Sequence, residues 1–284
     1  MTRRVLQTLA LHASAGSLAI LGAACGGTVR GSDDSSPTTQ VTYGVTTPMP
    51  PNKQSTREDR LSAHEGRVLP NVRLRIIYAG TPDADRAPDQ DEFLSWLVAS
   101  EYWGTLGQYG VGNGTVLSSV TVPRALLAPA ELVAPGGLIE IQDLDARVRV
   151  LVNGSATEDA FPGVAGADAY VIFLPDGLNV MISHRADYVS TTCVDERAYH
   201  AHDGTEPYAV IPPCAQGRGT VAVSHEIAEM VTDPVSARGW LSEGDVSKNG
   251  GEVADLCNHS VRVDGREVTQ LWSNRDGECV PYHP

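Results

Sequence analysis

The stretch at residues 219–234 places the tightest constraint on what this chain can fold into. Its apolar residues recur at helical spacing, and they are Val223, Ile227, Met230 and Val231. Residues three and four apart share one face of a helix, so the pattern predicts an α-helix over residues 219–232. The helix ends before Pro234, because proline disfavours helical geometry in the residue that precedes it. The apolar face of this helix has to be anchored in a core.

The other face carries the sequence His225-Glu226-Ile227-Ala228-Glu229. His225 and Glu229 lie one turn apart and point the same way, and both residue types are zinc ligands. Glu226 lies about 100° around the helix from His225, beside a bound ion rather than on it. There it could take a proton from metal-activated water and pass it on as a catalytic acid–base. The usual zincin motif has a second His where Glu229 stands. The alternative to a metal site is that these residues form an exposed charged helix face.

Two other segments offer further ligands for this metal site. Downstream, Asp255 is the candidate third metal ligand, and Glu252 is an alternative ligand or a residue that supports one. Upstream, His200 is a candidate fourth ligand or a group that polarises the substrate. The competing interpretation is that His200 and His202 lie in a surface loop. His259 is interpreted as a residue outside the ligand set.

The N-terminus has the pattern of an export signal. Arg3 and Arg4 precede a mostly apolar run at residues 6–21, and small residues lead to Cys25. A Cys after small residues resembles a lipobox, so we expect cleavage and lipidation at Cys25, although Gly22 stands where Leu is usual. The alternatives are a plain signal peptide or an unmodified start. Lipidation predicts an exported protein attached to a bacterial membrane at the periplasmic or extracellular face.

The remaining cysteines are Cys193, Cys214, Cys257 and Cys279. An oxidising compartment would join them in two disulfides, for which the sequence permits three pairings. We favour Cys193–Cys214 and Cys257–Cys279, because each closes a short local loop. The alternative is free buried thiols.

Periodicity predicts one α+β domain with a mixed sheet. Residues 1–24 are the expected signal peptide, residues 25–66 the lipidated Cys and a disordered tether, and residues 67–284 the folded domain. Expected strands cover residues 71–79, 115–122, 169–174, 178–183 and 208–211, and expected helices cover residues 89–109, 138–151 and 219–232. Short strands and turns are expected after that, ending near residues 270–273. The formal net charge of −14 repels phosphate backbones and argues against a nucleic-acid partner.

Several motifs around the helix resemble one known family. They are residues 224–234, Trp240, residues 252–257 and residues 270–274 ahead of Cys279. This pattern is similar to that of the extracellular exordium, or phosphate-induced-protein-1-like, family. The resemblance covers about residues 72–284 and implies secretion and a role at the cell surface. It does not bring an enzymatic activity, so the mechanism depends on the residues themselves.

Two functions are compatible with these residues. The first is a zincin-like, zinc-dependent hydrolase, most simply a metallopeptidase that acts on a protein or a cell-wall or other extracellular polymer. The second is a non-catalytic cell-surface binding module in which the metal site is structural or vestigial. An open coordination position favours catalysis, whereas a closed set of four protein ligands favours a structural ion.

Overall fold

A computed structural model of the chain describes residues 44–45, 60–82, 86–152, 164, 166–185, 188–195, 197–203, 206–216, 219–235, 238–242, 251–257 and 259–281. The chain from Gln40 to Pro284 groups into one compact unit. The expected signal peptide and Cys25 lie outside the described residues. None of the helices in the described ranges is both long and apolar enough to cross a membrane.

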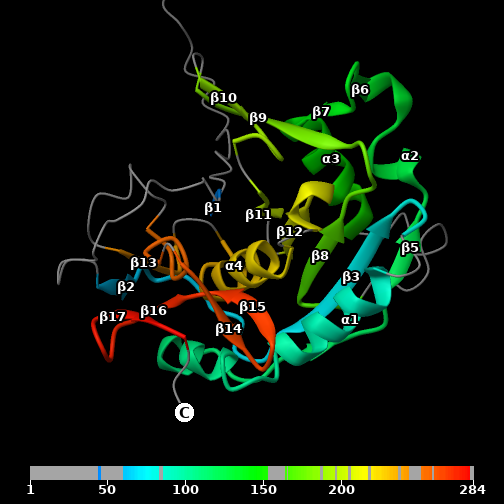
Figure 1. Ribbon diagram of the computed structural model, residues 1–284. Helices are drawn as coiled ribbons and strands as arrows, with labels where there is room; N and C mark the ends of the chain where they lie inside the picture. Colours follow the sequence, from blue (N-terminus) through cyan, green and yellow to red (C-terminus); the bar gives the residue numbers. More distant parts are fainter. Residues whose placement is uncertain are drawn as a thin grey trace, which may run out of the picture. The chain divides into compact units, whose positions relative to one another are not determined.

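A seven-stranded mixed sheet forms the centre of the fold (Figure 1). Its strands, in spatial order, are β1 (Gly44–Val45), β11 (Tyr199–Asp203), β12 (Glu206–Ile211), β8 (Ala169–Phe173), β3 (Arg73–Ala79) and β4 (Thr115–Val116), with β5 (Val120–Val122) also paired to β3. Strands β12, β8, β3, β4 and β5 pair in parallel, and the two strands at the other edge are antiparallel. Every residue of β8 is buried, as its uninterrupted apolar sequence predicts for a central strand.

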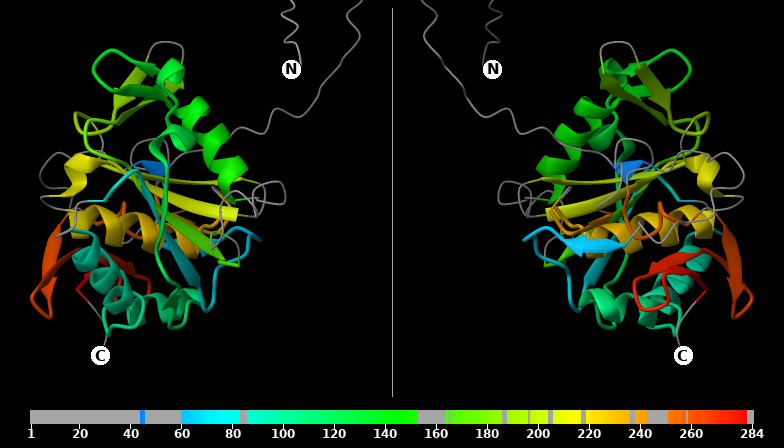
Figure 2. Two further views of the ribbon diagram at one scale, coloured as in Figure 1. Left: turned by 90° about the vertical axis from the view of Figure 1, so that its right-hand side faces the viewer. Right: turned by 90° about the vertical axis from the view of Figure 1, so that its left-hand side faces the viewer.

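Helices cover both faces of this sheet, and successive strand residues point to opposite faces. In β8, Val171 and Phe173 join one core, while Tyr170 and Ile172 join the other. The first core is covered by α4 (Gly219–Thr232), α1 (Arg86–Leu97) and the 3-10 helix η1 (Trp103–Tyr109). The second is covered by α3 (Ile141–Val152) and α2 (Arg124–Leu127). Figure 2 shows α3 on one side of the sheet and α4 and α1 on the other, and we call these sides the α3 face and the α4 face.

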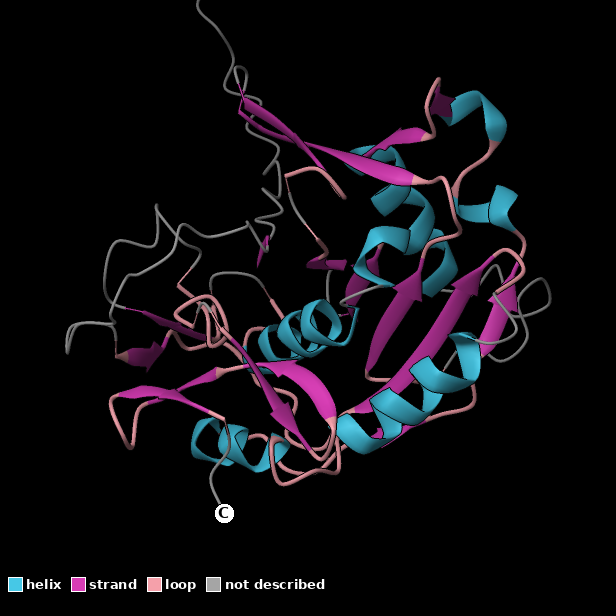
Figure 3. Ribbon diagram, viewed as in Figure 1, coloured by secondary structure: helices cyan, strands magenta, loops and turns pink. Residues whose placement is uncertain are grey.

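Smaller sheets complete the fold (Figure 3). A four-stranded sheet has the order β10 (Tyr188–Thr191), β9 (Asn179–Arg185), β7 (Leu138–Glu140), β6 (Val133–Ala134). Three two-stranded ribbons pair β13 (Trp240–Ser242) with β2 (Leu61–Ala63), β14 (Ser260–Val263) with β15 (Arg266–Thr269), and β16 (Leu271–Ser273) with β17 (Glu278–Val280). Two further 3-10 turns are η2 (Ala130–Leu132) and η3 (Pro213–Gln216). The fold is therefore mixed α and β, as expected, and its strands form several sheets.

The long helix expected at residues 89–109 is wrong, because the chain forms α1 and η1 instead. Ser100 lies between them, and its hydroxyl donates to the Leu97 carbonyl at 2.8 Å and accepts from the Trp103 backbone N–H at 3.3 Å. A serine hydroxyl competes in this way with helical backbone bonds. Helical apolar spacing continues across this break, so periodicity alone did not reveal it.

The single strand expected at residues 115–122 is also wrong, because β4 and β5 pair separately with β3. Between them, the Arg75 guanidinium donates to the carbonyl and hydroxyl oxygens of Ser118, at 2.7 and 3.0 Å. The Ser118 carbonyl thus accepts a hydrogen bond from a side chain of β3. The helix expected at residues 138–151 begins only at Ile141, since the three residues before it form β7.

The boundary expected between tether and domain also needs correction. Two short strands lie within residues 25–66: β1 pairs with β11, and β2 pairs with β13. Leu61 is buried in the core of the α4 face, and the Asn274 side chain hydrogen-bonds its backbone N–H and carbonyl. The folded domain therefore begins before residue 67. The other residues between 25 and 59 lie outside the described ranges.

Both disulfides favoured from the sequence are confirmed. Cys193 pairs with Cys214, and Cys257 pairs with Cys279. The alternative of free thiols is thereby excluded. Disulfides are typical of oxidising compartments such as the periplasm or the cell exterior.

Candidate metal centre

Helix α4 is buried on all sides from residue 222 to residue 232. Its apolar face packs into the core through residues such as Ile227 and Met230. Its polar face is covered as well, since Glu226 and Glu229 are 0% exposed and His225 is 7% exposed. The strands that contact α4 include β11, β12 and β15. This burial excludes the alternative of an exposed charged helix face.

The first group of possible ligands joins α4 to the turn at residues 251–257. The Nε2 atom of His225 lies 3.0 Å from Oε1 of Glu229 and 3.3 Å from Oδ1 of Asp255. One potential ligand atom from each of the three residues lies within 4.8 Å of the others. The Asp255 backbone N–H also donates to Oε1 of Glu229 at 3.0 Å. The sequence-predicted trio His225, Glu229 and Asp255 therefore comes together.

Local contacts hold Asp255 in place. The buried neighbours Val253 and Ala254 anchor the turn in the core, and the Trp272 backbone N–H donates to the Val253 carbonyl at 2.8 Å. The Cys257–Cys279 disulfide lies two residues after Asp255 and ties the turn to β17. An acidic side chain on this turn is therefore presented to α4 by apolar packing and a covalent link.

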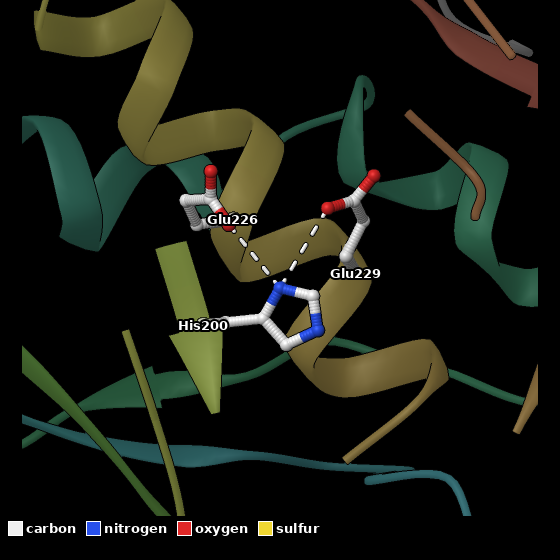
Figure 4. Close-up of side chains that lie close together, drawn as sticks. All are labelled: His200, Glu226 and Glu229. Atoms are coloured by element: carbon white, nitrogen blue, oxygen red, sulfur yellow. Dashed lines mark hydrogen bonds and ion pairs between the residues drawn. The ribbon is translucent and has the colours of Figure 1, made fainter. Parts of the chain in front are cut away.

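A second group of possible ligands lies on the other side of Glu229 (Figure 4). The Nδ1 atom of His200 lies 3.2 Å from Oε2 of Glu226 and 3.6 Å from Oε2 of Glu229. The Nε2 atom of the same ring lies 3.3 Å from Oε1 of Glu252. Glu229 is common to both groups, with one oxygen toward each.

Strand alternation explains why His200 faces α4. In β11, Tyr199 and Ala201 belong to the core of the α3 face, so His200 between them points to the α4 face. It is 2% exposed, so the alternative of a surface loop is wrong for this residue. His202 has the same strand parity as His200, but it is only partly buried. His259 is exposed.

The spacing of these atoms fits a bound cation. Two ligands about 2.0–2.1 Å from a tetrahedral zinc ion lie about 3.3 Å from each other. The separations in the two groups run from 3.0 to 3.6 Å.

Unsatisfied polar atoms point the same way. Within the described residues, five buried atoms of the cluster have no hydrogen-bond partner: His225 Nε2, Glu229 Oε2, Asp255 Oδ2, His200 Nε2 and Glu252 Oε1. The imidazole nitrogens among them do have a carboxylate oxygen within 3.0–3.3 Å, but in an orientation that makes no hydrogen bond. Buried polar groups without partners are costly, and a shared cation would satisfy them.

The electrostatics of the cluster are those of buried charges in mutual contact. Burial lowers the pKa of His225, but the charge of Glu229 and the adjacent Asp255 carboxylate outweigh it and raise the pKa well above its usual value. The pKa of His200 is raised in the same way against its burial, by Glu252 and Glu226.

For the carboxyl groups of Glu229 and Glu252, a raised pKa favours the neutral form, whereas for the histidines it favours the charged form. Burial and the charge of Asp255 raise the pKa of Glu229 well above its usual value, against the lowering effect of His225. Burial raises the pKa of Glu252 to about 7, even though His200 lowers it. The neighbouring histidines therefore do not offset the cost of burying Glu229 and Glu252 in their ionised form.

One neighbour of the site had no clear signal in the sequence. Tyr102 is fully buried beside Ser224 and Glu229, and burial raises its pKa, as does the charge of Glu229. Ser224 itself accepts a hydrogen bond from the Thr269 backbone N–H at 3.0 Å, which fixes α4 against β15. The contact of Tyr102 with the helix depends on the fold and has no local sequence pattern.

Comparison with known proteins finds no matching family model, no matching curated protein and no matching solved structure. The chemistry of the six clustered side chains is therefore the basis for inferring function.

Proposed function

We propose that this protein is an exported, zinc-dependent hydrolase, most simply a metallopeptidase. The observation that carries the proposal is the convergence of His225, Glu229 and Asp255 in a buried group, where His225 Nε2 and Asp255 Oδ2 lack hydrogen-bond partners within the described residues. One imidazole and two carboxylates form a donor set that suits zinc. Three protein ligands leave a position open for water or substrate, as in catalytic rather than structural zinc sites.

Zinc bound there would polarise a water molecule and the substrate carbonyl. Glu226 would accept the proton that the attacking water loses as its oxygen bonds to the carbonyl carbon. As the carbon–nitrogen bond breaks, Glu226 would return that proton to the leaving amine. The His200 ring, 3.2 Å from the Glu226 carboxylate, would hold this acid–base in position.

The setting of the site is part of the same proposal. A metal-binding helix with a third ligand from a later segment is compatible with a zincin-like fold, and the motif resemblance suggests an exordium-like surface protein. Two disulfides support export to an oxidising compartment. Lipidation at Cys25 would attach the protein to the cell-envelope membrane, where its substrate would be a protein or a cell-wall or extracellular polymer.

Elemental analysis of the purified full chain tests the metal. We expect zinc to be retained by the wild type and lost from the first group in His225→Ala. Glu226→Gln should retain that zinc and lose casein hydrolysis by about 10²–10⁴-fold, the usual contribution of acid–base catalysis. His259→Gln is the matched control, because this histidine is exposed and outside the cluster. Absence of zinc from the wild type would contradict the proposal.

The burial of the cluster favours a second candidate, a non-catalytic cell-surface binding module with a structural or vestigial metal site. Within the described part of the chain the six residues are at most 7% exposed, which gives a substrate little access. With a structural metal site, the wild type would contain zinc and hydrolyse neither casein nor cell-wall polymer. Glu226→Gln would then leave every measured activity unchanged.

A further inference from the structure

The second group beside Glu229 has the composition of a cation site in its own right. His200, Glu226 and Glu229 each offer one ligand atom, and these atoms lie within 4.8 Å of one another. All three side chains are at most 2% exposed. Figure 4 shows the Nδ1 atom of His200 directed between the two carboxylates.

The second group differs from a simple ion pair in one oxygen of Glu229, which lacks a hydrogen-bond partner within the described residues. Oε1 of Glu229 faces His225 and the Asp255 N–H, so that oxygen is used by the first group. Oε2 points to the other side, 3.6 Å from His200 Nδ1, and has no hydrogen-bond partner in the described part of the chain. A carboxylate whose two oxygens face two different groups can bridge two cations, an arrangement found in two-metal sites.

Glu252 lies next to the second group, on the side of the His200 ring that carries Nε2. Metal-bound histidines usually present their other ring nitrogen to a carboxylate or carbonyl, which fixes the ring. His200 has this arrangement, with Nδ1 toward Glu226 and Glu229 and Nε2 at 3.3 Å from Glu252. Glu252 is therefore the carboxylate placed to hold the His200 ring when Nδ1 binds a cation.

The charges of the six side chains also leave room for a second ion. The carboxyl groups of Glu226, Glu229, Glu252 and Asp255 carry four negative charges when ionised, against two imidazoles. With one divalent cation and neutral rings, two negative charges remain in a buried cluster. A second divalent cation balances them.

We propose that His200, Glu226 and Glu229 form a second divalent-cation site that shares the Glu229 carboxylate with the site at His225 and Asp255. The effect of this second site on hydrolysis rests on the proposed hydrolase function. Filling the second site engages Glu226, the proposed acid–base, as a ligand. The second ion is therefore inhibitory, and hydrolysis falls when metal exceeds one equivalent per chain.

Metal stoichiometry tests the site without an activity assay. The full chain is stripped with chelator, titrated with Zn²⁺, and bound metal is measured by elemental analysis after removal of the excess. We expect two ions in the wild type, one in His200→Gln, one in His225→Gln and none in Glu229→Ala. His259→Gln should keep both ions. Circular dichroism checks that each variant is folded.

Mn²⁺ titration followed by electron paramagnetic resonance gives a second readout that needs no activity assay. Two Mn²⁺ ions bridged by one carboxylate give an exchange-coupled signal. We expect this signal in the wild type at two equivalents of Mn²⁺, but not in His200→Gln or His225→Gln. A wild type that binds one ion, with no coupled signal, overturns the second site. If that ion is lost in His225→Gln, the proposed hydrolase site survives.

The activity arm tests the inhibitory consequence. We expect casein hydrolysis to rise to a maximum near one Zn²⁺ per chain and to fall several-fold at two. Full activity at two bound equivalents would overturn the inhibitory role. Two bound ions without hydrolysis at any loading would support the second site and contradict the proposed function.

Discussion

The two faces of the central sheet are built from the same strands but differ in what they bury. The core of the α3 face is apolar, and its buried Asp145 accepts a hydrogen bond from Tyr199 at 3.1 Å. The core of the α4 face is also largely apolar, yet it encloses two histidines and four carboxylates in mutual contact. Strand β11 serves both, with Tyr199 toward one face and His200 toward the other.

This difference separates two sources of stability. The α3 face is held by removal of apolar surface from water, which needs no ligand. The α4 face buries charges that must be neutralised by protons or cations. Stability contributed by the α4 face should therefore depend on metal, whereas that of the α3 face should not.

The largest effect is expected from a cavity in the α3 face. Ile172 is a fully buried residue of β8 on that face. Ile172→Ala should lower the free energy of unfolding by about 2–5 kcal/mol, from lost apolar burial and a residual cavity. Urea unfolding should give the same loss with and without chelator. A loss that depends on chelator would break the comparison between the faces.

Removal of metal should affect the α4 face next. A cation present at about 100–1,000 times its dissociation constant stabilises the folded state by about 3–4 kcal/mol, so chelation should lower the unfolding midpoint of the wild type. Glu229→Gln, which alters the carboxylate common to both groups, should respond much less to chelator. Equal responses in the two proteins, measured by calorimetry, would mean that metal binds elsewhere.

The two disulfides provide a matched pair across the molecule. They span 21 and 22 residues, so replacing either pair with serines should cost a similar amount, about 3 kcal/mol in the chain-entropy description. Only Cys257 lies two residues from Asp255. We expect zinc affinity to fall about tenfold in the Cys257→Ser, Cys279→Ser protein, as for other loss of ligand support. The Cys193→Ser, Cys214→Ser protein should bind zinc more nearly as the wild type does.

The smallest effect concerns an exposed charge pair, which should behave unlike the buried cluster. The Arg73 guanidinium donates to Asp168 at 2.8 and 3.1 Å, and this hydrogen bond, with the charge of Arg73, lowers the pKa of Asp168. Because the folded-state pKa lies below the unfolded value, the carboxylate stabilises the fold above about pH 4 and loses this effect as pH falls through the folded-state pKa.

Asp168→Asn should therefore lower the thermal midpoint slightly at pH 7, and the difference from the wild type should shrink toward pH 2. Salt should also reduce the difference, since the pair is exposed to solvent. Chelator should leave it unchanged. A difference that grows on acidification would contradict the direction of the pKa shift.

Much of this protein follows from the sequence because the relevant information is local. The bounds of α4, its apolar face and the shared direction of His225 and Glu229 depend on spacing within one helix, which backbone geometry determines. The buried central strand β8 and the two short-range disulfides were predictable for the same reason. Local polar competition at Ser100, by contrast, divided a helix that apolar spacing made continuous.

Only the tertiary structure decided what surrounds that helix. The burial of Glu226 and Glu229, the approach of Asp255, and the position of His200 between Glu226 and Glu252 all join separate elements. Their meeting depends on the register of β11 against β12 and on how the turn at residues 251–257 packs on the core. Sequence spacing sets directions within an element, whereas convergence between elements is set by packing over the whole fold.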